Sequence, residues 1–335
     1  CREFLANGKE AVKQVEGVAW LEEDEFRFTP IPRVPDLDSL PMAAWHLLPM
    51  DKYRAYQWQG FGTIRNPYAV IYSSVGCPYR CTFCAVNTVH EGRIYYRSPA
   101  NFVEEIDHLV REYGVRTYWV KDDTFNINRK RVVEICNLLI EREHDLNMFV
   151  YARSEGLDDE LCELMARAGI KWLFFGVESG NDVMLDKIKK KTTKEKLLAS
   201  FKTVNKAGLH VGANYLVGFP GDTRETCLET IQFAREVNAD CSWFGIVSPY
   251  PGTELYAHAL TNDVSLPDQW AEYGHYNGSA VEMSGLSGEE LVKLRKKGFV
   301  DTQLYLPYMA KFLKTFGVRA FVKDFSPRLI TSLRA

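Results

Sequence analysis

The chain has 335 residues, 46% hydrophobic and 25% charged, which is ordinary for a soluble globular protein. A formal net charge of −3 gives no basic field to attract nucleic acid or an anionic membrane, and no apolar run reaches the ~18 residues of a membrane span. Eight cysteines are too few for a disulfide scaffold at this length, and they indicate a protein of the reducing cytoplasm.

The first 64 residues differ in character from the rest. The segment GVAWLEEDEFRF predicts a short β-hairpin, and the proline-rich segment TPIPRVPDLDSLP predicts an extended linker. The opening, CREFLANGKEAV, reads as a helix already under way and begins with Cys1 rather than Met. We therefore expect the chain to be part of a longer protein, with residues 1–64 following a domain that lies upstream.

Strand-like and helix-like patterns alternate from about residue 65 to residue 255. The strand-like segments are rich in Val, Ile, Phe, Tyr and Trp, and several are continuous apolar runs, which is typical of parallel strands covered on both faces. The expected strands are 69–75, 117–123, 148–154, 172–179, 211–219 and 242–250.

Helical periodicity fills each interval between these strands. One helix is expected to begin at Ser98 and Pro99 and to end at Gly114. Two later helices carry capping-box spacings at their starts, in Thr192/Glu195 and Asp222/Glu225. Cys136, Cys162 and Cys227 lie in helical patterns and Cys241 begins a strand, so we interpret these four as small buried residues.

The alternation predicts a parallel α/β fold, and this pattern is compatible with an open sheet or with a barrel. In both, ligands bind at the carboxyl ends of the strands. Polar or glycine-rich residues stand at each of these ends: Cys77, Asp122-Asp123, Arg153-Ser154, Glu178-Ser179, Gly218 to Gly221 and Pro249 to Gly252.

Two further segments complete the expected organisation. The basic run from Lys187 to Lys196 is interpreted as a solvated turn before a helix. Residues 261–335 carry helical patterns and are expected to form a C-terminal helical region. The predicted domains are thus a linker and hairpin region (1–64), an α/β core (65–260) and the helical region (261–335).

Three cysteines, Cys77, Cys81 and Cys84, follow the first core strand within eight residues. A zinc site would need a fourth ligand, for which His90 is the nearby candidate. Dithiol redox chemistry would use only the last two cysteines. A four-iron cluster held by three thiolates would leave one iron open, and an open coordination position is typical of a reactive metal site.

The spacing Cys77-x3-Cys81-x2-Cys84, with Phe83 before the last cysteine, resembles the signature of the radical S-adenosylmethionine (radical SAM) enzymes. The resemblance covers roughly residues 65–255 and implies a partial TIM-type (β/α)6 barrel. It implies that the open iron of a [4Fe-4S] cluster binds the amino and carboxylate groups of S-adenosylmethionine. Electron transfer from the cluster then yields a 5′-deoxyadenosyl radical.

The resemblance also assigns cofactor-binding positions at the strand ends. KDDTF stands where the family places a GGE-like segment that contacts the methionine amine, which implicates Asp122 and Asp123. GVESG implicates Glu178 and Ser179 in contacts with ribose or methionine, and YARS places Arg153 where it could pair with a carboxylate. YLVGFPGDT resembles the segment of the fifth strand whose backbone faces adenine, which implicates Val217 and Gly218. Phe83 is a further candidate for contact with adenine.

Each of these residues also has a structural interpretation. The three acids are equally compatible with capping or solvated carboxylates, and Arg153 with an ion pair to one of them. Gly218 serves a turn as readily as a cofactor, and Phe83 serves packing as readily as adenine contact. The sequence does not identify a catalytic residue that acts on substrate.

Motifs such as DLDSLPMAAWHLLP, DDTFNINRKR and PYPGTELY are similar to those of the cobalamin-binding radical SAM subgroup. This resemblance implies a methyltransferase acting on an unactivated carbon, with cobalamin bound mainly by a domain outside this chain. The alternative within the family is an oxidative cyclase resembling the anaerobic magnesium-protoporphyrin monomethyl ester cyclase. The alternative of another class is a zinc-binding interaction module. The implied partners are a small-molecule substrate and an electron donor such as flavodoxin or ferredoxin.

Overall fold

The computed structural model describes residues 8, 10–11, 13–30, 36–54, 64–276 and 278–322. The chain divides into two compact units, Cys1–Pro41 and Met42–Ala335. In the smaller unit, strands β1 (Ala19–Glu22) and β2 (Glu25–Phe28) pair antiparallel, which confirms the predicted hairpin. Most of the helix expected at the start of the chain and part of the proline-rich linker lie outside the described residues.

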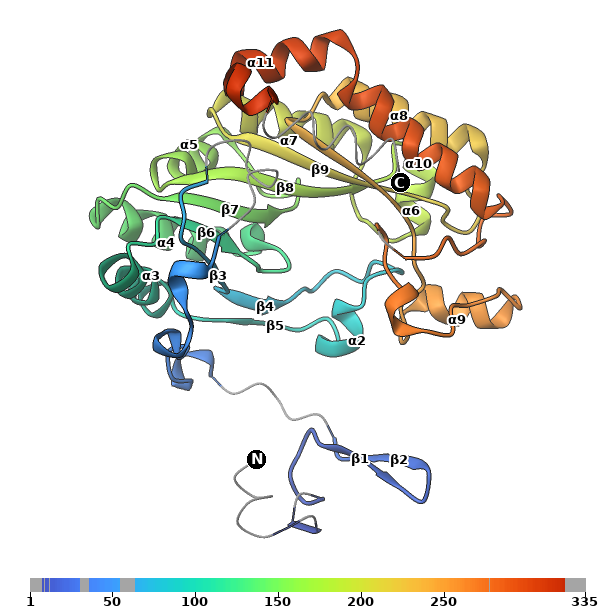
Figure 1. Ribbon diagram of the computed structural model, residues 1–335, viewed down its shortest axis with the longest axis horizontal. Helices are drawn as coiled ribbons and strands as arrows, with labels where there is room; N and C mark the ends of the chain where they lie inside the picture. The colour runs from blue at the N-terminus through green and yellow to red at the C-terminus, as the bar shows by residue number, and fades with distance from the viewer. Residues whose placement is uncertain are drawn as a thin grey trace. The chain divides into compact units, whose positions relative to one another are not determined.

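The larger unit is built on a six-stranded, fully parallel sheet with the strand order β10-β9-β8-β7-β6-β3 (Figure 1). Every core strand expected from the sequence is present. Strands that are adjacent in the sheet also follow one another along the chain, if only the six strands of this sheet are considered. This is the strand sequence of a partial TIM-type barrel. The strands are β3 (Tyr68–Ile71), β6 (Thr117–Val120), β7 (Asn147–Ala152), β8 (Ile170–Glu178), β9 (His210–Val217) and β10 (Cys241–Ile246).

The first core strand is shorter than predicted. Strand β3 ends at Ile71, and Ser74–Gly76 forms a separate strand, β4, that pairs antiparallel with β5 (Ile94–Tyr96). The break has a tertiary cause, because the carboxylate of Asp122, just beyond the end of the neighbouring strand β6, accepts the backbone N–H groups of both Ser73 and Ser74. Those two N–H groups therefore bond to a side chain instead of extending the parallel ladder.

Helices connect the consecutive parallel strands of the sheet, as crossovers between parallel strands require. Ser98 caps α3 and Gly114, with a φ of 65°, ends it, as expected from the sequence. The helices of the larger unit are α2 (Val86–His90), α3 (Pro99–Tyr113), α4 (Arg129–Glu141), α5 (Asp159–Arg167), α6 (Asp182–Lys187), α7 (Lys194–Lys206), α8 (Arg224–Val237), α9 (Glu254–Thr261), α10 (Gly288–Gln303) and α11 (Leu306–Ala320). Short 3-10 turns occur at Leu37–Ser39, Trp45–Leu47, Met50–Lys52, Phe125–Ile127 and Trp270–Glu272.

Two helix starts lie one residue later than the capping-box spacings predicted. The N-cap of α7 is Thr193, because the hydroxyl of Thr192 is instead 2.8 Å from that of Ser154. The capping box of α8 is formed by Thr223 with Thr226. Asp222, the predicted cap of α8, instead accepts the N–H groups of Gly218 and Phe219 just after β9.

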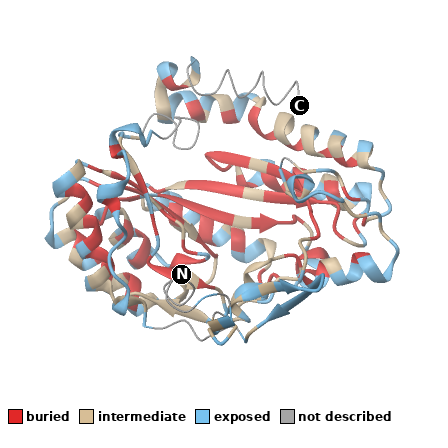
Figure 2. Ribbon diagram, turned by 60° about the horizontal axis from the view of Figure 1, so that its bottom comes forward, coloured by how far each residue is buried: buried red, intermediate tan, exposed pale blue. Residues whose placement is uncertain are grey.

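The two faces of the sheet bury different side chains. Residues such as Tyr118, Val150 and Phe175 point to the helices and belong to the main core, where buried residues line the sheet and the helix faces turned to it (Figure 2). The opposite face carries an aromatic cluster with ring centroids 5.5–6.3 Å apart. We define the aromatic cluster as Trp119, Phe149, Trp172, Phe174 and Trp243.

Helix α11 packs on this aromatic cluster near the amino ends of the strands. The ring of Phe316 stacks on Trp172 at 5.9 Å, and Lys311 pairs with the buried carboxylate of Asp240 at 3.0 Å. In the segment predicted to be a C-terminal helical region, the described residues form α10 and α11. Within the described residues, no helix combines the length and the apolarity needed to cross a bilayer.

Candidate functional site

The three cysteines lie together in the loop between β4 and α2, at the carboxyl end of the sheet. All are free thiols and only partly buried, whereas Cys136, Cys162, Cys227 and Cys241 are fully buried, as expected. Gly76 introduces the loop with a φ of 90°, where a Cβ would lie 2.2 Å from the carbonyl oxygen of Arg93. Only glycine fits there, so the sharp exit from the strand is built into the sequence.

The loop is anchored at its centre rather than at its ends alone. The N–H of Thr82 donates to the carbonyl of Ile188 at 3.1 Å, and the carbonyl of Thr82 accepts from the N–H of Leu255 at 3.0 Å. The thiol of Cys81 lies 3.8 Å from the carbonyl oxygen of Lys189. Segments from two distant parts of the chain therefore fix the loop that presents the thiols.

The thiols are close enough to influence one another electrostatically. Burial raises the pKa of Cys77, and it raises the pKa of Cys84 to about 11. Each of these two pKa values is raised further by the negative charge of neighbouring cysteines, and Arg153 and Lys190 oppose the rise at Cys77 and Cys84 respectively. Binding of a metal cation to the three sulfur atoms would thus displace the thiol protons, because thiolates are the metal ligands.

This pKa gives a testable pH dependence in the cluster-free protein. The alkylation rate of Cys84 by iodoacetamide should rise about tenfold per pH unit from about pH 7 to about pH 10, because only the thiolate reacts. A free cysteine, with a pKa of about 8.5, should level off within that range. Peptide mass spectrometry measures both rates, and a plateau for Cys84 near about pH 9 would contradict the buried environment.

Asp122 and Asp123 brace the approach to the cysteine loop. Asp122 is fully buried and accepts four hydrogen bonds, from the backbone N–H and the hydroxyl of both Ser73 and Ser74. Asp123 accepts the N–H of Gly76 at 2.8 Å, and burial raises its pKa. The four donors occupy the carboxylate of Asp122, so its geometry fits a bracing role better than the direct cofactor contact expected from the resemblance.

Glu178 ends β8 in a left-handed conformation, with a φ of 66°, at a β-bulge. Its carboxylate is buried and pairs with the ammonium of Lys190 at 2.8 Å. A buried ion pair thus lies at a bulge, a feature that often re-aims a side chain near an active site. Unlike Asp122 and Asp123, which accept backbone N–H groups, Glu178 pairs with a side-chain cation.

Arg153 joins the cysteine loop to the end of β7. Its guanidinium stacks over the ring of Tyr79 at 3.7 Å, pairs with Glu155 at 3.0 Å and donates to the carbonyl of Lys190. The structural interpretation of Arg153 was an ion pair with Asp122, Asp123 or Glu178. In the structure, Arg153 pairs with Glu155 instead. Because Tyr79 lies between Cys77 and Cys81, this stacking ties the arginine to the loop that holds the thiols.

The other expected positions are engaged in packing or turns. The ring of Phe83 is buried 5.4 Å from that of Phe219, which favours the packing interpretation. The hydroxyl of Ser179 is shared with Thr230 of α8 at 3.3 Å. The carbonyl of Val217 accepts from Val247, and the N–H of Gly218 donates to Asp222. An adenine contact at these two residues would have to use other backbone atoms.

The basic run from Lys187 to Lys196 helps to fix the cysteine loop, which the sequence does not indicate. Lys190 and Thr192 are buried, and the carbonyls of residues 188–190 bond to the cysteine loop and to Arg153, so the interpretation of this run as a solvated turn is wrong for its central part. His275 was also missed, although its ring lies 6.2 Å from that of Phe83. No sequence pattern marks which lysine of a basic run is buried.

The donor set fits an iron–sulfur cluster. Three free, partly buried thiols share one anchored loop, and two cations, Arg153 and Lys190, lie within electrostatic range of them. In the part of the chain that the structure describes, no three His, Cys, Asp or Glu side chains are placed to hold a single metal ion between them.

Comparison with known proteins identifies the class. Residues 71–234 match the sequence family described as the radical SAM superfamily, and the chain belongs to that superfamily. It is 31% identical over 301 residues to an uncharacterised methyltransferase of Pyrococcus horikoshii, covering 90% of this chain and 63% of the relative. It is 28% identical over 277 residues to the anaerobic magnesium-protoporphyrin IX monomethyl ester cyclase of Cereibacter sphaeroides, covering 81% of this chain and 43% of the relative.

Among solved structures, the chain is similar to the cobalamin-dependent S-adenosylmethionine radical enzyme OxsB. The TM-score is 0.66 at 16% sequence identity, with 98% of this chain and 53% of OxsB covered. At this identity the likeness establishes the fold alone, and it confirms the expected partial TIM-type α/β barrel. The chain spans 63% of the length of the Pyrococcus horikoshii relative and 43% of the length of the Cereibacter sphaeroides relative, which is about half of each.

Proposed function

We propose that this chain is the radical-generating part of a cobalamin-dependent radical SAM methyltransferase that acts on an unactivated carbon. The observation that carries the proposal is the anchored loop with Cys77, Cys81 and Cys84, at the carboxyl edge of a sheet whose fold and family are those of radical SAM proteins. The methyltransferase relative that matches 90% of the chain supports methyl transfer. Cobalamin would be held mainly by residues outside this chain.

In the proposed site the three thiolates would hold a [4Fe-4S] cluster, and Glu178 and Lys190 would hold the zwitterionic end of S-adenosylmethionine. A bound cluster supplies the electron that cleaves the cofactor. The chain itself contributes orientation, because Arg153 and Tyr79 fix the loop and Asp122 fixes its approach. The aromatic cluster, on the face of the sheet opposite the main core, would keep water out of the barrel interior.

The proposal includes the cellular setting. All seven cysteines of the described residues are free, which supports a reducing, cytoplasmic location. A small-molecule substrate and a low-potential electron donor of the flavodoxin or ferredoxin type complete the expected partners. The second candidate function, an oxidative cyclisation, is favoured by the cyclase relative that matches 81% of the chain.

Product analysis separates these functions. The full-length protein, reconstituted anaerobically with iron, sulfide and cobalamin, should convert S-adenosylmethionine to 5′-deoxyadenosine when reduced. A methyltransferase should also form S-adenosylhomocysteine, because a second molecule of S-adenosylmethionine remethylates cobalamin. A cyclase should form 5′-deoxyadenosine without it. Mass spectrometry measures both nucleosides, and the absence of both from a protein with a complete cluster would exclude the proposal.

A further inference from the structure

Lys121 is a cation on the barrel-facing side of the sheet, just beyond the end of β6. It follows Trp119 by two residues, so both side chains lie on the face that carries the aromatic cluster. Its ammonium lies 4.2 Å from the ring centroid of Trp119 and 4.9 Å from that of Tyr151. The two rings hold the charge against an otherwise aromatic surface.

The ammonium has no carboxylate partner among the residues that the structure describes. Glu178, on the same side of the sheet, is already paired with Lys190, and the ion pairs found in the described ranges do not include Lys121. Its hydrogen bond is to the hydroxyl of Tyr151 at 3.1 Å. A partly buried cation without a counter-charge is costly, which makes an anionic ligand the natural partner.

Lys121 and Tyr151 both offer hydrogen-bond donors. The oxygen of Tyr151 accepts from Lys121, so the phenolic proton remains available to donate. Two N–H bonds of the Lys121 ammonium also remain after this hydrogen bond. A cation with unused donors and a phenol that can donate therefore lie within hydrogen-bond distance of each other, a composition suited to carboxylate or phosphate oxygens.

We infer that Lys121 and Tyr151 bind an anionic group of the substrate, a carboxylate or a phosphate carried on a flat apolar body that packs against Trp119. The inference rests on the proposed function only in calling this ligand the substrate. It names a substrate class: organic acids or phosphate esters with an aromatic or otherwise flat apolar framework. The charged group would lie at Lys121 and the apolar body along the aromatic cluster.

Calorimetry on the reconstituted chain, without reductant, tests the inference through binding alone. The probes are naphthoate, naphthyl phosphate and the neutral naphthamide, which share one ring system. The wild-type chain should bind at least one of the anions roughly tenfold or more tightly than the amide, as expected of a charge-assisted hydrogen bond. The order of the two anions then assigns the group.

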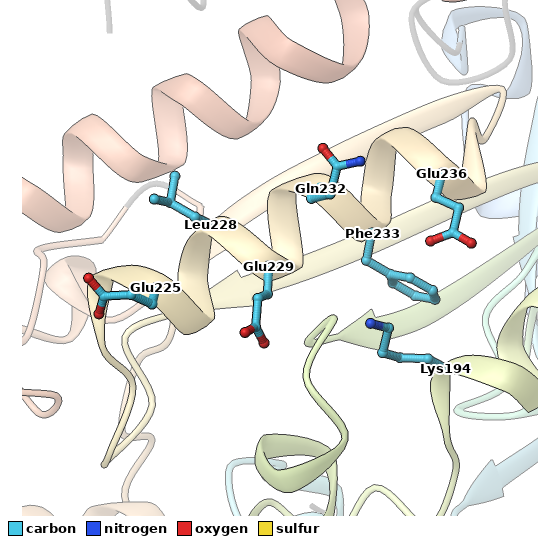
Figure 3. Close-up of a pocket in the computed structure, with 7 residues that line it drawn as sticks. All are labelled: Lys194, Glu225, Leu228, Glu229, Gln232, Phe233 and Glu236. Carbon is cyan, nitrogen blue, oxygen red and sulfur yellow. The ribbon is translucent and has the colours of Figure 1, made fainter.

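Variants locate the effect. Lys121→Met should remove the preference for the anion while leaving the weaker binding of naphthamide, and Lys121→Arg should retain the preference. Lys194→Met is the matched control, because Lys194 also lies over an aromatic ring, that of Phe233 at 5.4 Å. This pair lies between α7 and α8, in a hollow of about 380 Å³ on the helical side (Figure 3).

Defined results would overturn the inference. A wild-type chain that binds neither anion, or binds both no better than the amide, contradicts it, and so does a Lys121→Met variant that keeps the preference. Unchanged iron–sulfur absorbance and circular dichroism identify variants that are folded. Because nucleoside products play no part in these measurements, a failure here is distinct from a failure of the proposed radical chemistry.

Discussion

Cys81→Ala is expected to abolish the iron–sulfur chromophore of the reconstituted chain and to lower 5′-deoxyadenosine formation by roughly 100-fold or more. Cys81 is the central thiol of the loop and lies against the carbonyl of Lys189. With three protein thiolates for four irons, the loss of one leaves two irons without a protein ligand. Visible absorbance and analysis of iron and sulfide measure the cluster, and mass spectrometry measures the nucleoside.

Cys162→Ala is the control for this substitution. Cys162 is buried in α5 among core residues, so its replacement should cost about 1 kcal/mol in the free energy of unfolding and leave the cluster intact. Equal loss of chromophore in both variants would show that the cysteines act through stability and not as ligands. A colourless wild-type protein with stoichiometric zinc would support the zinc-binding alternative instead.

Asp122→Ala is expected to lower the free energy of unfolding by roughly 3–5 kcal/mol and to prevent stable cluster assembly. The substitution leaves four buried donors, two N–H groups and two hydroxyls of Ser73 and Ser74, without their acceptor. These donors lie at the junction from which the chain enters the cysteine loop. Chemical denaturation measures the stability, and the visible absorbance measures the cluster.

Asp122→Asn separates the bracing role from the charge. Both backbone N–H groups donate to the same oxygen, Oδ1, which an amide retains, and both serine hydroxyls can rotate to accept from the new NH2 group. This variant should therefore lose less than about 1.5 kcal/mol and keep its cluster. Asp182→Asn, on the exposed start of α6, should change neither quantity. If Asp122→Asn lost the cluster while Asp122→Ala stayed stable, the bracing role would be wrong.

The order and type of the core elements could be predicted because each leaves a local pattern. Apolar runs such as AVIYS and WLFFGVES identify buried strands, and Ser98 with Gly114 delimits α3. Two of the errors occur where a distant side chain competes for a local group. Asp122 takes the N–H groups of Ser73 and Ser74 from the first strand, and Ser154 takes the hydroxyl of Thr192 from a helix cap.

The location of the candidate site could be predicted from the sequence, but the contacts between its side chains could not. The strand-end rule placed the cysteines, Arg153 and Glu178 at one edge of the sheet, where the structure has them. It could not show that Glu178 pairs with Lys190 or that Arg153 stacks on Tyr79. A basic run looks the same in sequence whether its lysines are solvated or buried, so Lys190 was assigned to the surface.

The sequence by itself determined the class of chemistry, because the spacing of Cys77, Cys81 and Cys84 and the alternation of strands and helices are local features. Only the tertiary structure decided the duties of the charged residues. Asp122 became a brace, Lys190 a buried partner of Glu178, and Lys121 a cation without a carboxylate partner among the described residues. The physical reason is that the effect of a charge depends on its neighbours and its burial, and the fold brings these together from residues far apart in the chain.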